Sequence, residues 1–149
     1  MEPVGNGWIA HCTGISCNGY NISLKNRMDD DLCINSLIFE DNVESVGAFA
    51  FSDFGIRILK LSQKLTVICW EAFAENPMLV TVTIPASVTD IESGAFRDCI
   101  GLRELVIEGD LSRTANWAED AFTGCPCEEL YLNLRRCLSV NQKRQIYNY

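Results

Sequence analysis

The chain has 149 residues, of which 48% are hydrophobic and 21% are charged, so it can fold as one domain around its own core. Its formal net charge of −8 argues against a nucleic-acid-binding surface, which needs clustered lysines and arginines. No apolar run approaches the roughly 20 residues of a membrane-spanning helix, and no signal peptide is visible, which favours a cytoplasmic location unless the chain is the mature part of an exported protein.

Residues 1–33 fit no complete repeat of the kind that follows them, and we expect them to form an N-terminal cap or a degenerate first coil. Four glycines in this segment indicate turns between short apolar stretches. His11, Cys12, Cys17 and Cys33 suggest a zinc site by residue type, but their spacing matches no strong zinc-binding pattern. We interpret them as packing or a disulfide within the cap.

From residue 34 onward the sequence repeats with a period of about 23 residues, and each unit closes on an Ala-Phe pair. A rival pair, Ala48-Phe49, is rejected because it would put Glu44 where the other units have an aliphatic residue. The alanines of the accepted pairs are 22, 23 and 26 residues apart, so the last unit is longer than the others. The accepted pairs are Ala50-Phe51, Ala72-Phe73, Ala95-Phe96 and Ala121-Phe122.

Each unit begins with apolar residues in the pattern L-x-x-L-x-L, which in the third unit are Leu79, Val82 and Ile84. The last two are two residues apart, so on a β-strand they point to the same side and into a core. A turn and a second apolar pair, Val88 and Ile91, follow. Stacked units would place the phenylalanines of successive Ala-Phe pairs in one buried ladder, and no unit would be stable alone.

The third unit, from Leu79 to Cys99, closely resembles a repeat of the BspA-like leucine-rich-repeat family. The hallmark of that family is a strand ending in Ile-Pro, followed by Ser-Val, Ile, Ala-Phe and Cys. The resemblance covers about residues 34–132, although Phe54 and Asn76 replace the cysteine in two units. It implies a right-handed leucine-rich-repeat solenoid of short parallel β-strands, stacked from about four to five coils, that binds proteins or surfaces.

The repeat pattern fades toward the C-terminus. Leu130 and Leu132 keep the spacing of the strand positions and predict a fifth strand, so the solenoid is expected to span residues 34–133. Residues 134–149 are expected to form a C-terminal cap or tail. A Ser-x-x-Gln capping box within this segment predicts a short helix near residues 139–147.

Residues that would carry catalysis are scarce. The sequence has no glycine-rich phosphate loop, no serine in a nucleophile elbow and a single histidine, His11. Cys99 and Cys125 occupy the cysteine position of the repeat, and Cys125 and Cys127 form C-x-C rather than the redox motif C-x-x-C. We therefore expect no enzymatic activity, cofactor or metal, and we expect most of the eight cysteines to be free, buried thiols.

The outward-facing side of the predicted strands, which we call the strand face, is the candidate binding surface. It mixes apolar, charged and aromatic side chains, as protein interfaces do. Tyr131 is its strongest anchor by type, since tyrosine is enriched at interface hot spots. The residues predicted to contact a partner are Ile58, Lys60, Thr81, Thr83, Glu104, Val106, Glu108 and Tyr131.

Three functions are compatible with these patterns. The first is a recognition module or scaffold that binds another protein through the strand face. The second is a small structural subunit held within a larger assembly by its caps and basic tail. The third is an extracellular adhesin fragment that binds protein or glycan.

Overall fold

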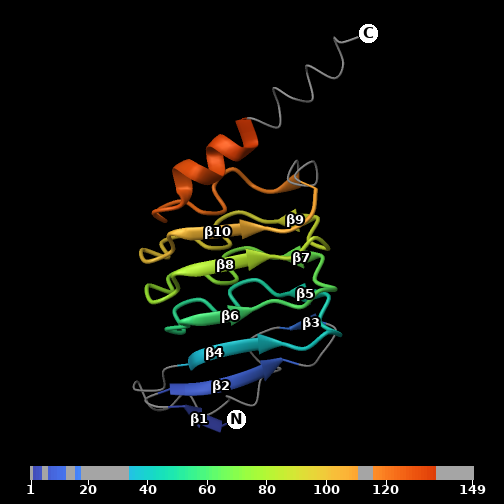
Figure 1. Cartoon of the computed structure of the whole chain (residues 1–149), viewed down its shortest axis with the longest axis vertical. Coiled ribbons are helices and arrows are strands. Elements are labelled where there is room, and N and C mark those ends of the chain that lie inside the picture. The colour runs from blue at the N-terminus through green and yellow to red at the C-terminus, as the bar shows by residue number, and fades with distance from the viewer. Residues whose placement is uncertain (1, 5–6, 13–15, 18–33, 111–115, 137–149) are drawn as a thin grey trace.

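The structure is a computed structural model, and it describes residues 2–4, 7–12, 16–17, 34–110 and 116–136. Within these ranges short strands alternate with turns, and a helix occupies residues 128–136 (Figure 1). The strands are β1 (Glu2–Val4), β2 (Gly7–Cys12), β3 (Ser16–Cys17), β4 (Ile34–Phe39), β5 (Ser45–Val46), β6 (Ile58–Lys60), β7 (Val67–Ile68), β8 (Thr81–Ile84), β9 (Asp90–Ile91) and β10 (Glu104–Ile107).

The longer strands stack into a front column. β2 pairs with β4, β4 with β6, and β8 with β10, all in parallel, and β6 and β8 lie side by side between the two sheets (Figure 1). The register keeps equivalent repeat positions together, with Leu37 opposite Leu59 and Val82 opposite Leu105. The predicted short parallel strands, one per repeat unit, are therefore confirmed through β10.

The two-residue strands β3, β5, β7 and β9 stack into a parallel back column. Val46, Ile68 and Ile91 follow one another in register, and Ile91 forms a further parallel bridge with Trp117. Trp117 is buried and occupies the position that isoleucine or valine fills in the other units. The additional residues of the last unit therefore lie between Ile107 and Trp117.

The Ala-Phe turns close each coil and form a third line of contacts along the stack. The amide of Phe51 donates to the carbonyl oxygen of Ala72, and the next two coils repeat this bond at the same 2.8 Å. The rings of Phe51, Phe73, Phe96 and Phe122 are fully buried and stack with centroids 5.7, 5.3 and 5.0 Å apart. This confirms the predicted ladder and its anchors, because Ala50 and Phe51 are buried whereas Phe49 is exposed.

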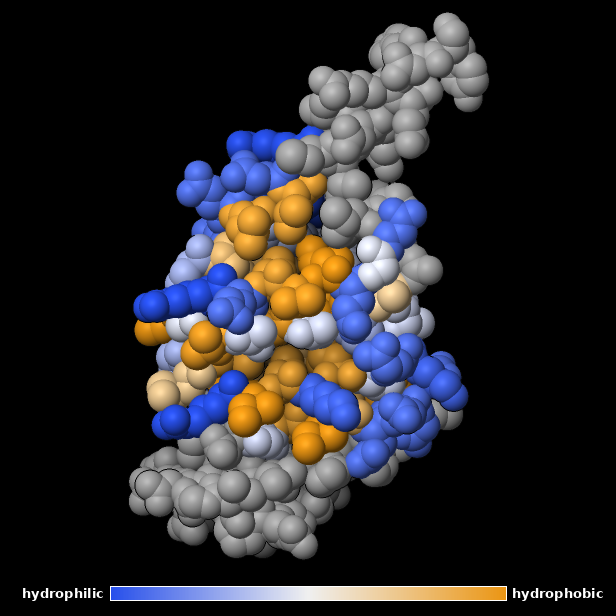
Figure 2. Space-filling model, viewed as in Figure 1, coloured by the Kyte–Doolittle hydropathy of each residue, from blue (hydrophilic) through white to orange (hydrophobic). Residues whose placement is uncertain are grey.

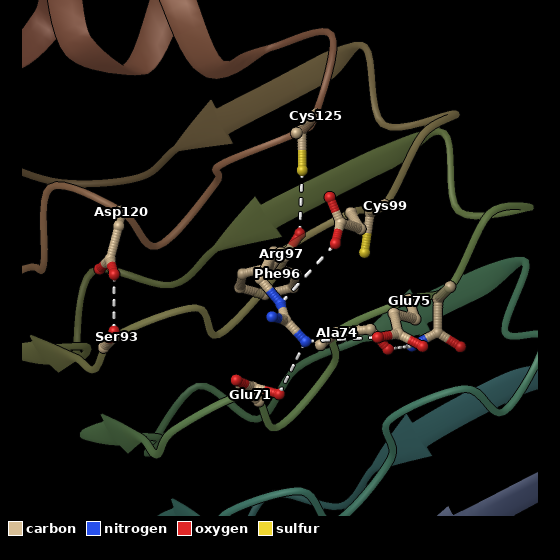
Figure 3. Close-up of polar contacts among 12 residues, drawn as sticks. Glu71, Ala74, Glu75, Ser93, Phe96, Arg97, Cys99, Asp120 and Cys125 are labelled. Atoms are coloured by element: carbon tan, nitrogen blue, oxygen red, sulfur yellow. Dashed lines mark hydrogen bonds and ion pairs between the residues drawn. The ribbon is translucent and has the colours of Figure 1, made fainter.

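The position four residues after the alanine carries a second, polar ladder in the last three units, whereas the first unit has Phe54 there. Asn76 Nδ2 donates to the Phe51 carbonyl oxygen over 3.0 Å, Cys99 Sγ to that of Phe73 over 3.2 Å, and Cys125 Sγ to that of Phe96 over 2.9 Å. Figure 3 shows the last of these contacts. Asparagine and cysteine therefore perform the same task in successive coils, which is to satisfy a buried carbonyl of the coil before.

The predicted fifth strand is wrong, because residues 128–136 form a helix. Glu128 and Glu129 stand at its N-terminus and Arg135 and Arg136 near residue 136, an order that suits the helix dipole. No helix among the described residues is long and apolar enough to cross a membrane. The helix predicted near 139–147 lies outside the described residues.

The N-terminal segment extends both columns. β2 and β3 continue the front and back columns, and β1 pairs antiparallel with β2.

Candidate protein-binding surface

The strand face lies on the outside of the front column. In β8 the side chains of Thr81 and Thr83 are exposed while Val82 and Ile84 are buried, because successive side chains of a strand point to opposite sides. Figure 2, viewed as in Figure 1, shows hydrophobic residues gathered along the stack between hydrophilic ones. The predicted residues that are exposed on this side are Ile58, Lys60, Thr81, Thr83, Glu104, Val106 and Glu108.

Apolar side chains are the distinguishing feature of this face. Ile58 on β6 is 57% exposed and Val106 on β10 is 46% exposed, although both are large hydrophobic residues. Thr81 Oγ1 lies 3.1 Å from Glu104 Oε2, so β8 and β10 contribute a hydrogen-bonded pair to the same surface. The face therefore offers separated apolar groups in a polar frame, which is how protein interfaces are composed.

Sequence reasoning missed the residues that directly precede these strands. Val80 is exposed, and its carbonyl oxygen accepts the amide of Arg103 over 2.9 Å. Arg57 and Arg103 are also exposed and stand just before β6 and β10. The leucine pattern could have found Val80, because it falls on one of the two x positions between Leu79 and Val82 that L-x-x-L-x-L leaves outside the buried set.

Tyr131 does not belong to the strand face, and its assignment as a partner-binding residue is wrong. It lies on the helix, is only 1% exposed, and its hydroxyl donates to the Ala118 carbonyl oxygen over 2.6 Å. Its ring lies 4.6 Å from that of Phe122 and ends the aromatic ladder. The chain turns into a helix here because Cys127 and Tyr131, four residues apart, then bury one helical side against the last coil.

The burial of Tyr131 makes stability depend on pH at the alkaline end. Burial raises the pKa of Tyr131 to about 12 from an ordinary value of 10, although the neighbouring Arg135 acts in the opposite direction. The unfolded chain loses this proton near pH 10 and the folded chain near 12, so the stabilisation is complete below pH 10 and is lost as the pH rises toward 12. We expect a loss of about 2 to 3 kcal/mol.

A spectrophotometric titration of phenolate absorbance checks this expectation. The native protein should show a tyrosine step near pH 12, and the Tyr131→Phe variant should lack it. A native titration curve identical to that of the variant would contradict the burial of this phenol.

The described cysteines lie along the Ala-Phe turns and at the start of the helix. Cys69, Cys99, Cys125 and Cys127 are free thiols, and the last three are buried. Hydrogen bonding to Cys125, together with burial, raises the pKa of the Cys127 thiol and keeps it protonated. Among the described residues, no group of three or more metal-ligating side chains is placed to hold an ion. The side chains of His11, Cys12 and Cys17, and the whole of Cys33, lie outside the described part.

Comparison with known proteins agrees with the repeat pattern. The model of the BspA-type leucine-rich-repeat region matches residues 23–139 in six copies, whereas the repeat analysis gives four units and a strand. No curated protein matches the chain. A crystal structure similar to this one is that of a leucine-rich cell surface protein from Faecalibacterium prausnitzii, with a TM-score of 0.50 and 16% sequence identity. The match covers 80% of this chain and 35% of the other, so the chain spans about a third of the length of that protein.

Proposed function

Because the chain belongs to the BspA-type leucine-rich-repeat family, we propose that it is a non-enzymatic binding module whose strand face recognises another protein. The observation that carries this proposal is the exposure of Ile58, Val80 and Val106 along the front column. Apolar side chains that are exposed on neighbouring strands form a patch, and burying such a patch against a partner lowers the free energy of the complex. Lys60, beside them on β6, adds a charged group that can set the orientation of the partner.

The proposal includes the overall form of the stack. Parallel strands joined through a crossover are right-handed in almost all proteins, which supports a right-handed solenoid. We propose four to five coils of about 23 residues, with caps at residues 1–33 and 134–149. Such caps would shield the core at both ends of the stack, which its repeats leave open.

Site-directed photo-crosslinking tests the strand face. A photoreactive phenylalanine analogue at Thr83, in the middle of the face, should give a discrete protein adduct in source cells. The same analogue at Thr89, which is exposed beside the back column, serves as the control. The double substitution Ile58→Ser and Val106→Ser should remove the Thr83 adduct without changing the melting temperature. Equal adducts from both positions, or none from Thr83, would refute the strand face as the site.

A surface-exposed adhesive role is the second candidate. It is favoured by the structural relative from Faecalibacterium prausnitzii, which is described as a cell surface protein. Labelling intact source cells with an antibody raised against the strand face would test it. Staining that requires permeabilised cells would contradict this role and leave the recognition module in place.

A further inference from the structure

Two exposed aromatic residues stand apart from the strand face. Phe49 is 56% exposed and Trp70 is 59% exposed, and both lie between the back column and the Ala-Phe turns. The amide of Phe49 donates to the carbonyl oxygen of Trp70 over 2.9 Å, so the two residues are neighbours on successive coils. Neither ring contributes to the buried ladder, although Phe49 belongs to the Ala48-Phe49 pair that imitates its anchor.

Phe49 stands at a turn where the backbone is left-handed. Its φ of 57° lies in the left-handed region, which a bulky side chain rarely adopts. The equivalent positions of the second and third units hold Glu71, with a φ of 49°, and Gly94, with a φ of 66°, so the repeat itself sets this conformation. An aromatic ring that is held at this turn and left outside the core is available to contact a partner.

The next two coils place carboxylates beside this pair. Glu92 Oε2 accepts the amide of Trp70 over 3.0 Å, and Asp120 Oδ2 accepts the Ser93 hydroxyl over 2.6 Å (Figure 3). Glu119 is exposed next to Asp120. We call the set Phe49, Trp70, Glu92, Ser93, Glu119 and Asp120 the aromatic–acidic strip.

The strip has no cation of its own. The three-residue segments that form it are 47–49, 69–71, 92–94 and 118–120, and they contain no lysine or arginine. Arg97 lies nearby, but its guanidinium pairs with Glu71 and Glu75 at 3.1 and 3.3 Å. The strip thus combines two exposed aromatic residues with carboxylates that form no ion pair with another described residue.

We propose that the aromatic–acidic strip is a second interaction surface that binds a cationic, arginine-bearing segment of a protein partner. An arginine guanidinium stacks on the face of an exposed tryptophan or phenylalanine and pairs with carboxylates at the same time. The net charge of −8 of the chain would accelerate the approach of such a segment. The strip is independent of the strand face, since Phe49 and Trp70 lie on the other side of the Ala-Phe turns from the front strands.

Binding of a defined peptide tests the proposal. A fluorescein-labelled peptide of alternating arginine and glycine should bind the intact chain at physiological salt, and it should change tryptophan emission. Trp70→Ala removes one ring and no charge, so we expect it to weaken binding about three- to tenfold and to remove part of the emission change. Phe49→Ala should act in the same direction. Glu92→Gln removes one negative charge, so it should also weaken peptide binding and reduce the dependence of the peptide affinity on salt.

The controls separate the strip from general attraction to an acidic protein. Ile100→Ala removes an exposed apolar side chain, 65% exposed, from a different loop and should leave peptide affinity unchanged. The strand-face variant Ile58→Ser should also bind the arginine peptide normally. Failure of the strand face as a binding site would therefore leave the test of the strip valid. Unchanged affinity in Trp70→Ala, or an equal loss in Ile100→Ala, would overturn the proposal. Trp70-dependent binding of a neutral oligosaccharide without binding of the arginine peptide would overturn the assignment to a cationic partner.

Discussion

Replacing Asn76 with alanine is expected to lower the free energy of unfolding by about 3 to 6 kcal/mol, a large fraction of the stability of a small domain. The Asn76 side chain is fully buried, and its Oδ1 accepts the amides of Phe54 and Ile56 at 3.2 and 3.1 Å. Its Nδ2 donates to the carbonyl oxygens of Phe51 and Phe73 at 3.0 and 2.8 Å. Alanine would remove these bonds and leave the amide of Ile56 and the carbonyl oxygen of Phe51 without this buried partner, whereas the carbonyl oxygen of Phe73 would keep Cys99 Sγ. An unsatisfied buried group costs more than the bond itself contributes.

Urea denaturation of the Asn76 variants measures this effect. Asn133, exposed on the helix, provides the matched control, and Asn133→Ala should change stability by less than about 0.5 kcal/mol. Asn76→Asp keeps the shape but removes both donors and buries a carboxylate. Its deficit relative to the native protein should shrink as the pH falls, because the buried carboxyl is favoured when protonated. Similar midpoints for Asn76→Ala and Asn133→Ala would refute the role of this side chain.

The same position explains why this family pattern tolerates different residues. Cys99 and Cys125 each give one hydrogen bond to the preceding phenylalanine carbonyl, whereas Asn76 also receives two backbone amides. Asn76→Cys should therefore destabilise the protein less than Asn76→Ala, because one donor is kept. In the sequence, Asn76 is only a departure from the cysteine of the repeat. Its hydrogen bond to the Phe51 carbonyl oxygen shows that it takes over the role that Cys99 and Cys125 have in the later units.

The regular part of the fold was accessible from the sequence because its signals are local and repeated. The spacing of Val82 and Ile84, repeated in each unit, fixes which side of a strand is buried. The choice of Ala50-Phe51 over Ala48-Phe49 depended on one position, Glu44, and the burial of Phe51 confirms it. Because the same pattern occurs in several units, the prediction does not depend on any single unit and tolerates an irregular one.

The prediction failed where repetition ends. Leu130 and Leu132 satisfy a strand spacing, but in the structure Tyr131 between them is the buried residue. What decides the outcome is the last ring of the ladder, Phe122, which needs a cover and which Tyr131 covers from the helix. That requirement is a tertiary one, and local spacing does not report it. For the same reason the candidate site lost its only aromatic anchor on the strand face.

The two proposed surfaces differ in the physical basis of binding. The strand face presents Ile58, Val80 and Val106 among polar groups, so its contribution to affinity would come from apolar burial and be insensitive to salt. The aromatic–acidic strip would bind through charge and ring stacking, so its affinity would fall with ionic strength. Salt dependence measured separately for strand-face and strip variants therefore distinguishes the surfaces without knowledge of the native partner.

Phe96→Ala is expected to destabilise the protein by about 3 to 5 kcal/mol, because it removes a ring from the middle of the ladder. The Phe96 ring is fully buried, and its centroid lies 5.3 Å from that of Phe73 and 5.0 Å from that of Phe122. Its loss would leave a cavity between neighbouring coils, and because each coil buries its core side only against its neighbours, the coils on both sides would lose support.

Phe49→Ala is the matched comparison, since it makes the same chemical change in the same chain at a ring that is exposed. It should alter stability by less than about 1 kcal/mol. Calorimetric melting of both variants measures the difference, and we expect a much lower melting temperature for Phe96→Ala alone. Equal shifts in melting temperature would show that a buried ring of the ladder contributes no more to stability than an exposed ring does. The Ala-Phe pairs would then not be what holds the coils together. A large shift confined to Phe96→Ala would place the cohesion in the ladder and leave Phe49 free to serve the surface.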